Sequence, residues 1–307
     1  MRDCCGKRIA PGLIDTHVHG ARGRNYMEGS AEAAAAISDF LIRGGTTSCL
    51  ATTTSAGRAD EAAALRGLRE ASMHPVKGQA EILGIHLEGP FINPRNRGSQ
   101  AEENIRAASG PELEEIAEAA AGALKIVTLA PEMDGAAEAI DFFIRRGIKV
   151  SIGHTSATFA QAQAALHAGA GRGTHLFNAM PPIHHREPGA VLALLLDPSA
   201  FLEMTVDGHH LAPEIIQMVL KLAGPERCVL ITDGVDVRGC GDGTFQRWEG
   251  TTVIVRDGQA RTPKGSLAGS MLSLSDAVRN AVRLAKVPIG TAIRMASEIP
   301  ARSVGVF

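Results

Sequence analysis

The sequence predicts a (β/α)8 barrel that occupies the whole chain of 307 residues as a single domain. Three observations predict this fold class. Short apolar runs alternate with amphipathic helical stretches, no low-complexity linker divides the chain, and polar residues suited to catalysis follow several of the apolar runs. Because the carboxyl ends of barrel strands converge on one face, these scattered polar residues would share one pocket.

Eight apolar runs are expected to form the strands of the barrel. They are short and rich in aliphatic and β-branched residues, as strands are. The predicted strands are Arg8–Asp15, Thr46–Thr52, Ile82–Glu88, Leu124–Leu129, Ile148–Gly153, Gly171–Leu176, Phe201–Val206 and Arg227–Thr232. So many strand-then-helix units in one domain favour a closed barrel over an open sheet.

Ala- and Leu-rich stretches between these strands have the periodicity of amphipathic helices. The predicted helices are Ala31–Arg43, Ala59–Ser72, Pro111–Ala121, Gly135–Arg146, Ser156–His167 and Pro213–Leu222. Ser30 and Ser156 are the expected N-caps of two of them. Gly44-Gly45, Gly147 and Gly169 are expected to end helices at the C′ position.

A segment of different character follows the eighth predicted strand. Residues 243–263 contain Trp248 and the alternating run TTVIVRDG, which ends in a turn signal. Alternation of this kind is typical of a half-buried strand, so we predict a β-hairpin inserted over residues 240–263.

Composition and charge exclude several classes of protein. The chain is 45% hydrophobic and 21% charged, with a net charge of −2 and interspersed signs, so neither a nucleic-acid partner nor a membrane surface is predicted. No signal peptide or long apolar run is recognised. The five cysteines are odd in number and form no CxxC, which favours the cytoplasm, and the vicinal pair Cys4-Cys5 is expected to be incidental.

Histidines and carboxylates recur at the ends of the predicted strands. His17 and His19 follow the first strand and, being two residues apart, would point to the same face. Glu88 ends the third strand, His154 follows the fifth, and His175 lies in the sixth. We therefore expect them to meet at one barrel mouth, together with Asp233 after the eighth strand.

These residue types predict a metal centre. Glu88, His154 and His175 offer one carboxylate and two imidazoles, which suit Zn²⁺ or another divalent ion, with Fe²⁺, Mn²⁺ and Co²⁺ as alternatives. An open coordination position would hold a water whose pKa falls toward neutrality, and Asp233 is the expected general base and acid. His17 and His19 are expected either to hold a second ion, with Glu88 bridging, or to cap the site without one.

Motifs along nearly the whole chain carry a resemblance to a known family. In order, they are PGLIDTHVHG (11–20), HLEGPFINP (86–94), GHTSA (153–157), THLFNAMPP (174–182), REPG (186–189), VDGHH (206–210), ITDG (231–234) and SLAGS (266–270). Together they resemble the N-acetylglucosamine-6-phosphate deacetylases of the metal-dependent amidohydrolase superfamily. The resemblance implies an amidohydrolase-type barrel. The implied reaction is hydrolysis of N-acetylglucosamine 6-phosphate to glucosamine 6-phosphate and acetate in amino-sugar catabolism.

The same resemblance implies residue roles. Glu88, His154 and His175 would bind the main metal, and Asp233 would be the proton shuttle. Asn178, Ala179 and His210 would bind the phosphate of the sugar, and Arg186 would reach it from the neighbouring subunit of a homodimer. The other expected substrate-binding residues are Ser99, Gln100, Asp207, Leu267, Ala268 and Gly269.

Two departures from the family pattern stand out. Gln100 occupies a position where many members carry a histidine that polarises the amide carbonyl. Glutamine can donate a hydrogen bond but cannot be cationic, which predicts weaker oxyanion stabilisation or an altered substrate. The small β-sandwich of the family is expected to be largely missing, because few residues precede the first motif and the chain stops soon after PARSVGV (300–306).

Three alternatives stay open at this stage. The substrate could be the galactosamine epimer, the chain could be another amidohydrolase acting on cyclic amides or acyl-amino acids, or it could be an inactive metal-binding barrel. The lack of a strand-end lysine, together with Glu88 and Arg186, argues against the second alternative. The complete set of ligands and Asp233 argues against the third.

Overall fold

The computed structural model describes residues 9–248 and 250–306, and its centre is a sheet of eight parallel strands paired in chain order. The strands are β1 (Leu13–Val18), β4 (Thr46–Thr52), β5 (Glu81–Glu88), β6 (Leu124–Leu129), β7 (Lys149–Ile152), β8 (Arg172–Gly173), β9 (Phe201–Thr205) and β10 (Cys228–Ile231). Cys4, Cys5 and the first residue of the predicted strand Arg8–Asp15 lie outside the described residues.

The sheet closes on itself between its first and last strands. Beyond the end of β10, the backbone N–H of Asp233 donates to the carbonyl of His17 at 2.9 Å, and that of His19 donates to the carbonyl of Gly234 at 2.8 Å. The hydroxyl of Thr232 donates to the buried carboxylate of Asp15 at 2.6 Å. The predicted (β/α)8 barrel is thereby confirmed.

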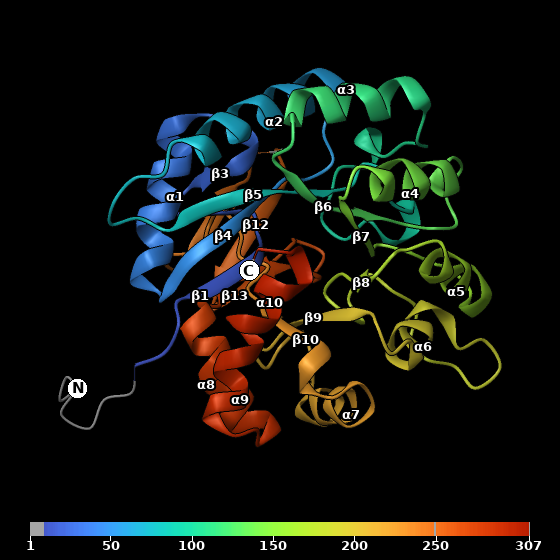
Figure 1. Ribbon diagram of the computed structural model, residues 1–307. Helices are drawn as coiled ribbons and strands as arrows, with labels where there is room; N and C mark the ends of the chain where they lie inside the picture. Colours follow the sequence, from blue (N-terminus) through green and yellow to red (C-terminus); the bar gives the residue numbers. More distant parts are fainter. Residues whose placement is uncertain (1–8, 249, 307) are drawn as a thin grey trace.

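Helices surround the strands (Figure 1), with their apolar faces against the barrel. The helices are α1 (Ala31–Arg43), α2 (Arg58–Met73), α3 (Gly110–Ala120), α4 (Ala136–Arg145), α5 (Phe159–His167), α6 (Gly189–Leu196), α7 (Pro213–Ala223), α8 (Leu274–Ala285), α9 (Ile289–Met295) and α10 (Glu298–Val304). Short 3-10 turns occur at Tyr26–Glu28, Pro94–Asn96, Glu102–Asn104 and Pro225–Arg227, and β2 (Gly20–Ala21) pairs with β3 (Arg24–Asn25). Within the described part of the chain, we find no helix with the length and apolarity needed to cross a bilayer.

Helix ends follow the predicted signals with one exception. Ser30 caps α1 by accepting the N–H of Ala33 at 3.1 Å, and Gly45, Gly147 and Gly169 follow helices with φ angles of 86°, 75° and 108°. The predicted N-cap Ser156 is wrong. Thr158 caps α5 instead, because the Ser156 hydroxyl donates to Asn96 in a loop that precedes the helix.

Two strands also differ from prediction by more than one residue at an end. β1 begins after Pro11-Gly12 and runs to Val18, so that His17 lies within the strand rather than after it. β8 has only two residues, and His175, with a left-handed φ of 29°, lies beyond its end. An extended strand cannot continue through a left-handed residue, which explains why the apolar run was longer than the strand.

The insert after β10 is larger than the hairpin predicted over residues 240–263. It is an antiparallel sheet of four strands, β11 (Gly243–Gln246), β12 (Thr252–Arg256), β13 (Gln259–Arg261) and β14 (Leu267–Ser270). Its own small core includes Val253, Val255 and Ala268. Ser270, at the end of β14, donates its backbone N–H to the carbonyl of Asp233 at 2.8 Å, which ties the insert to the barrel mouth.

A buried carboxylate in the first turn of α2 makes the stability of the fold depend on pH. Burial and the neighbouring Glu112 raise the pKa of Glu61 from its ordinary value of 4.5 to about 8, although Arg106 opposes this shift. A carboxyl group whose pKa is higher in the folded than in the unfolded protein makes its full contribution to stability at pH values below its unfolded-state pKa. That stabilisation is lost as the pH rises toward the folded value.

We therefore predict that Glu61→Gln removes part of the pH dependence of stability. Between pH 5 and 8, wild type should lose up to about 1.4 kcal/mol per pH unit relative to the variant. Urea unfolding across this range measures the difference. Glu118→Gln, an exposed position on α3, should keep the wild-type slope. Parallel curves for wild type and Glu61→Gln would contradict the prediction.

Candidate active site

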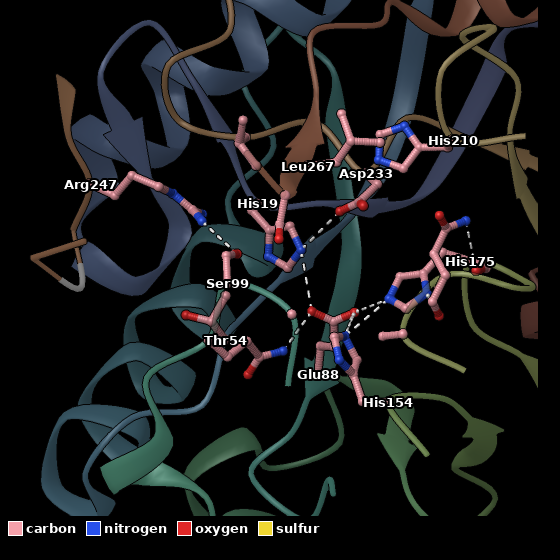
Figure 2. Close-up of a pocket in the computed structure, with 17 residues that line it drawn as sticks. His19, Thr54, Glu88, Ser99, His154, His175, His210, Asp233, Arg247 and Leu267 are labelled. Atoms are coloured by element: carbon pink, nitrogen blue, oxygen red, sulfur yellow. Dashed lines mark hydrogen bonds and ion pairs between the residues drawn. The ribbon is translucent and has the colours of Figure 1, made fainter. Parts of the chain in front are cut away.

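Glu88 is the point at which the predicted metal ligands meet. It is the last residue of β5 and is 3% exposed. Its Oε1 lies 3.1, 3.3 and 3.2 Å from the Nε2 atoms of His17, His154 and His175. Figure 2 shows this carboxylate among the imidazoles at the floor of a cavity. The structure thus brings together groups that come from three separate strand ends and from within β1.

An uncommon backbone conformation places three of the site residues. His154, His175 and Asp233 follow β7, β8 and β10 with positive φ angles of 47°, 29° and 50°. Only a few per cent of non-glycine residues adopt this left-handed region, and those that do cluster at functional sites. At each position the chain turns away from the strand while its side chain stays at the barrel mouth (Figure 2).

Hydrogen bonds determine which ring nitrogen of His154 and His175 faces the cavity. Nδ1 of His154 lies 2.7 Å from the carbonyl of Asn96, and Nδ1 of His175 lies 3.1 Å from the carbonyl of Asn178. Because a carbonyl only accepts, each Nδ1 must carry the hydrogen. In the neutral rings both Nε2 atoms are then bare acceptors, yet they lie 3.0 Å apart and next to the Glu88 carboxylate. A cluster of acceptors this close fits a cation.

A second set of acceptors adjoins the first. Nε2 of His17 and Nε2 of His19 are 3.2 Å apart, and Nε2 of His19 lies 3.5 Å from Oε2 of Glu88. His17, His19 and Glu88 together satisfy the distances required of a metal-binding group, as do Glu88, His154 and His175. The residues therefore fit two cations that share Glu88.

Asp233 borders the second set. Its Oδ1 lies 3.4 Å from Nε2 of His19 and 3.7 Å from Nε2 of His17, and its side chain is 13% exposed. Burial would raise the pKa of Asp233. However, the hydrogen bond from His19 and the charges of His17, His19 and His175 bring it down to about 2. Asp233 is therefore a carboxylate at neutral pH and is able to accept a proton.

The neighbouring groups show the same electrostatic coupling. Burial alone would raise the pKa of Glu88, but His17 and His154 hold it well below its ordinary value. Burial alone would lower the pKa values of His17 and His154, but Glu88 raises both. Glu88 is thus an anion that stabilises positive charge on His17 and His154.

The cavity above these groups has a volume of about 340 Å³ and contains most of the predicted substrate-binding residues. Those that line it are Ser99, Gln100, Asn178, Ala179, His210, Leu267 and Gly269. Sequence reasoning missed the lining residues Thr54, Gly98, Val235, Arg247 and Ser266. Thr54 had a usable signal, because it follows the predicted strand Thr46–Thr52 in the same way that the histidines follow theirs.

Arg247 had no such signal. It lies in the insert, where only the folding of β11 to β14 over the barrel mouth brings it to the cavity. Its side chain is 2% exposed, its Nε donates to Asp236 at 3.1 Å, and its Nη1 donates to the hydroxyl of Ser99 at 3.2 Å. Arg247 and Ser99 lie on one side of His19, and His210 and His175 lie on the other (Figure 2).

Gln100 has a fixed orientation at the cavity wall. Its carbonyl oxygen accepts hydrogen bonds from the amide and the hydroxyl of Ser55, at 2.8 and 2.5 Å. Its amide nitrogen therefore faces Glu88, to which it donates at 3.0 Å. The amide has a second N–H, which can donate to a substrate carbonyl.

Four predicted site residues do not line the cavity. His17 lies beneath the floor, fully buried, and Ala268 packs in the core of the insert. Asp207 lies behind His210, whose Nδ1 is 2.6 Å from its carboxylate. Arg186 lies on an exposed loop and contacts His185, with 2.6 Å between its Nη1 and the ring Nε2.

Comparison with known proteins agrees with this geometry. The sequence model of the amidohydrolase family matches residues 8–307 of this chain. The chain is 40% identical to N-acetylglucosamine-6-phosphate deacetylase of Vibrio furnissii, over 97% of this chain and 74% of that protein. It is 39% identical to N-acetylgalactosamine-6-phosphate deacetylase of Escherichia coli O157:H7, over 97% of this chain and 78% of that protein.

A solved structure extends the similarity to the fold. The crystal structure of N-acetyl-D-glucosamine-6-phosphate deacetylase from Mycobacterium smegmatis superimposes with a TM-score of 0.92 at 37% identity, covering 97% of this chain and 78% of that one. The chain therefore belongs to the amidohydrolase family, in the branch that contains the N-acetylglucosamine-6-phosphate deacetylases.

Proposed function

We propose that this chain hydrolyses the acetamide of N-acetylglucosamine 6-phosphate to glucosamine 6-phosphate and acetate. The observation that carries the proposal is the ionised carboxylate of Asp233 beside the acceptor cluster around Glu88, at the floor of a cavity. The names of the two bacterial relatives supply the substrate class, an N-acetylated amino sugar with a 6-phosphate.

The acceptor cluster is the proposed cation site. Glu88, His154 and His175 would hold the main ion, and His17 and His19 would hold a second ion with Glu88 shared. Imidazole and carboxylate ligands suit Zn²⁺, with Fe²⁺, Mn²⁺ and Co²⁺ as alternatives. A divalent cation in this position supplies a Lewis acid that polarises the amide carbonyl and activates water at neutral pH.

Asp233 is the proposed proton shuttle. Its low pKa keeps it ionised, so that it can take a proton from the attacking water and pass it to the leaving amine nitrogen. Gln100 would donate its remaining amide N–H to the carbonyl oxygen of the acetamide. Because Ser55 and Glu88 already hold this side chain, it needs no reordering when the substrate binds.

His210 and the backbone of Ala179 are the proposed phosphate contacts. The Asp207 carboxylate outweighs the effect of burial and raises the pKa of His210, which favours an imidazolium facing the cavity. Asn178 donates its side-chain amide to the carbonyls of His175 and Leu176, at 3.2 and 3.3 Å. Asn178 would therefore contribute to the phosphate site in part by fixing the conformation of the loop at residues 175–178.

A homodimer would complete the phosphate site. Arg186 is exposed and lies outside the cavity of its own subunit, on a loop whose residues 182–187 are all exposed. A guanidinium is well shaped for bidentate binding of phosphate. We propose that Arg186 binds the phosphate in the partner subunit.

N-acetylgalactosamine 6-phosphate is the second candidate substrate, because the relative from Escherichia coli O157:H7 bears that name. The cytoplasm is the proposed location, where free thiols such as the described Cys49, Cys228 and Cys240 are stable.

The proposed reaction predicts acetate release from both phosphosugars but not from unphosphorylated N-acetylglucosamine. Activity should be lost on chelation and return with Zn²⁺. Asp233→Asn should lower kcat by at least about 100-fold while leaving the fold unchanged, because an amide cannot accept the proton. Enzymatic detection of acetate measures the rates.

The matched control for this variant is Asp39→Asn, an exposed carboxylate of α1 that bonds only to Arg43 among the described residues. It should keep full activity. Near-wild-type rates in Asp233→Asn would show that this residue is not the proton shuttle. Metal-dependent binding without any turnover would favour an inactive barrel instead.

The proposed dimer predicts complementation between two impaired variants, assayed at a substrate concentration below the wild-type KM. Arg186→Ala should raise KM by at least about 10-fold, because the phosphate loses a charged hydrogen bond. When Arg186→Ala is unfolded and refolded together with Asp233→Asn, a hybrid dimer has one site with both residues intact. Random assembly should then restore about one quarter of the wild-type activity.

Arg43→Ala serves as the control for loss of an exposed arginine, and its activity should equal that of wild type. If the mixture of variants shows no gain over the sum of the separate variants although hybrid dimers form, Arg186 does not act across an interface. A monomer in analytical ultracentrifugation would lead to the same conclusion.

The Asp207–His210 pair predicts a pH dependence of substrate binding. A histidine with a raised pKa stays cationic up to a higher pH, so phosphate binding should persist there and weaken as the pH rises through that pKa. In Asp207→Asn the rise of KM should move about one pH unit lower, because the carboxylate that stabilises the imidazolium is gone.

Steady-state kinetics from pH 5.5 to 9 measure this shift. Titration of the phosphate near pH 6 occurs equally in both proteins and cancels in the comparison. Superimposable KM profiles for wild type and Asp207→Asn would contradict a charged role for His210.

A further inference from the structure

A second buried carboxylate lies directly beneath the acceptor cluster. Glu203 points into the barrel from β9 and is 0% exposed. Its Oε2 lies 3.0 Å from Nδ1 of His17 and accepts the backbone N–H of His175 at 3.3 Å. Glu203 thus contacts one residue from each of the two proposed cation sites without lining the cavity.

Arg172 fixes the other oxygen of this carboxylate. Its Nη2 donates to Oε1 of Glu203 at 2.8 Å, and the arginine is 1% exposed. An arginine has donors only, so Oε1 must act as an acceptor. Within the described residues, Nε and Nη1 of Arg172 have no hydrogen-bond partner, which leaves Glu203 as its counter-charge. Oε2 is therefore the oxygen that serves His17.

A separate cation site at Glu203 is unfavourable. His17, His86 and Glu203 lie close enough together to form a metal-binding group. However, Nδ1 of His86 lies 3.1 Å from the carbonyl of Thr16, and its Nε2 lies 2.8 Å from the hydroxyl of Thr128. With both ring nitrogens of His86 engaged, Glu203 serves His17 as a hydrogen-bond acceptor.

We propose that Glu203 is the positioning residue that makes His17 a metal ligand. The proposal rests on the two-cation site of the proposed function. As an acceptor only, Oε2 places the hydrogen of the neutral His17 ring on Nδ1, so that Nε2 presents its lone pair to the site shared with His19 and Glu88. Partners of this kind typically contribute 10–100-fold to metal affinity.

Glutamine at this position would reverse the arrangement. Its carbonyl oxygen would face the donors of Arg172, and its NH₂ group would then point at Nδ1 of His17. Nδ1 would have to accept, and the ring hydrogen would move to Nε2, where it would block metal binding. Aspartate keeps the charge but is one methylene shorter, so it would hold His17 more loosely.

Metal content tests the proposal. Wild type loaded with Zn²⁺ and desalted should hold two ions per chain by plasma mass spectrometry. Glu203→Gln should hold one, or bind its second ion at least about 10-fold more weakly in chelator competition. Glu203→Asp should hold two ions, with an intermediate loss of affinity. His17→Ala/His19→Ala, which removes the second site itself, should hold one.

The matched control is Glu112→Gln. The Glu112 carboxylate is also buried and lies 2.5 Å from the guanidinium of Arg106, but it does not pair with a histidine among the described residues. It should keep two ions. A purely structural role for Glu203 predicts a lower melting temperature with unchanged stoichiometry and affinity, and that result would overturn the proposal.

A spectroscopic measurement on unmutated protein covers the case in which Glu203→Gln does not fold. In ¹⁵N-histidine spectra of zinc-loaded protein, the signals lost in His17→Ala should show a hydrogen on Nδ1 and none on Nε2. Hydrogen on Nε2 would overturn the proposal. So would a wild type that holds only one ion, although acetate release by that protein would leave the deacetylase proposal intact.

Discussion

Closure of the barrel between β1 and β10 is the constraint on which the site depends. The hydrogen bonds between the backbones of His17 and Asp233, and of His19 and Gly234, join residues from the two ends of the strand order. Without them, the proposed proton shuttle would not face His17 in β1 and His19 just beyond its end. Main-chain hydrogen bonds do not depend on the type of residue. Here they bring together the side chains on which the proposed chemistry depends.

The electrostatics of the site have one source. Glu88 is a buried anion surrounded by imidazoles whose outer nitrogens are already bonded to Asn96, Asn178 and Glu203. In the neutral rings of His154, His175 and His17 these bonds make the inner nitrogens acceptors, so the protein itself orients all three toward Glu88.

Much of this could be predicted from the sequence, because strand-end positions are visible as apolar runs followed by polar residues. Thr46–Thr52, Leu124–Leu129 and Ala31–Arg43 have the predicted bounds. What failed depended on contacts distant in the sequence. Ser156 does not cap the helix because its hydroxyl donates to Asn96. Arg247 reaches the cavity only through the folding of the insert. Local propensity carries no information about either contact.

The bond between Arg247 and Ser99 has a consequence for how such an enzyme can diversify. The reacting groups stand on barrel strands and their first following residues, whereas part of the cavity wall comes from the insert. Loops and inserts accept sequence change more readily than the scaffold that carries them. The part of the cavity wall that the insert supplies can therefore change in sequence without altering the strand-end residues that carry the proposed chemistry.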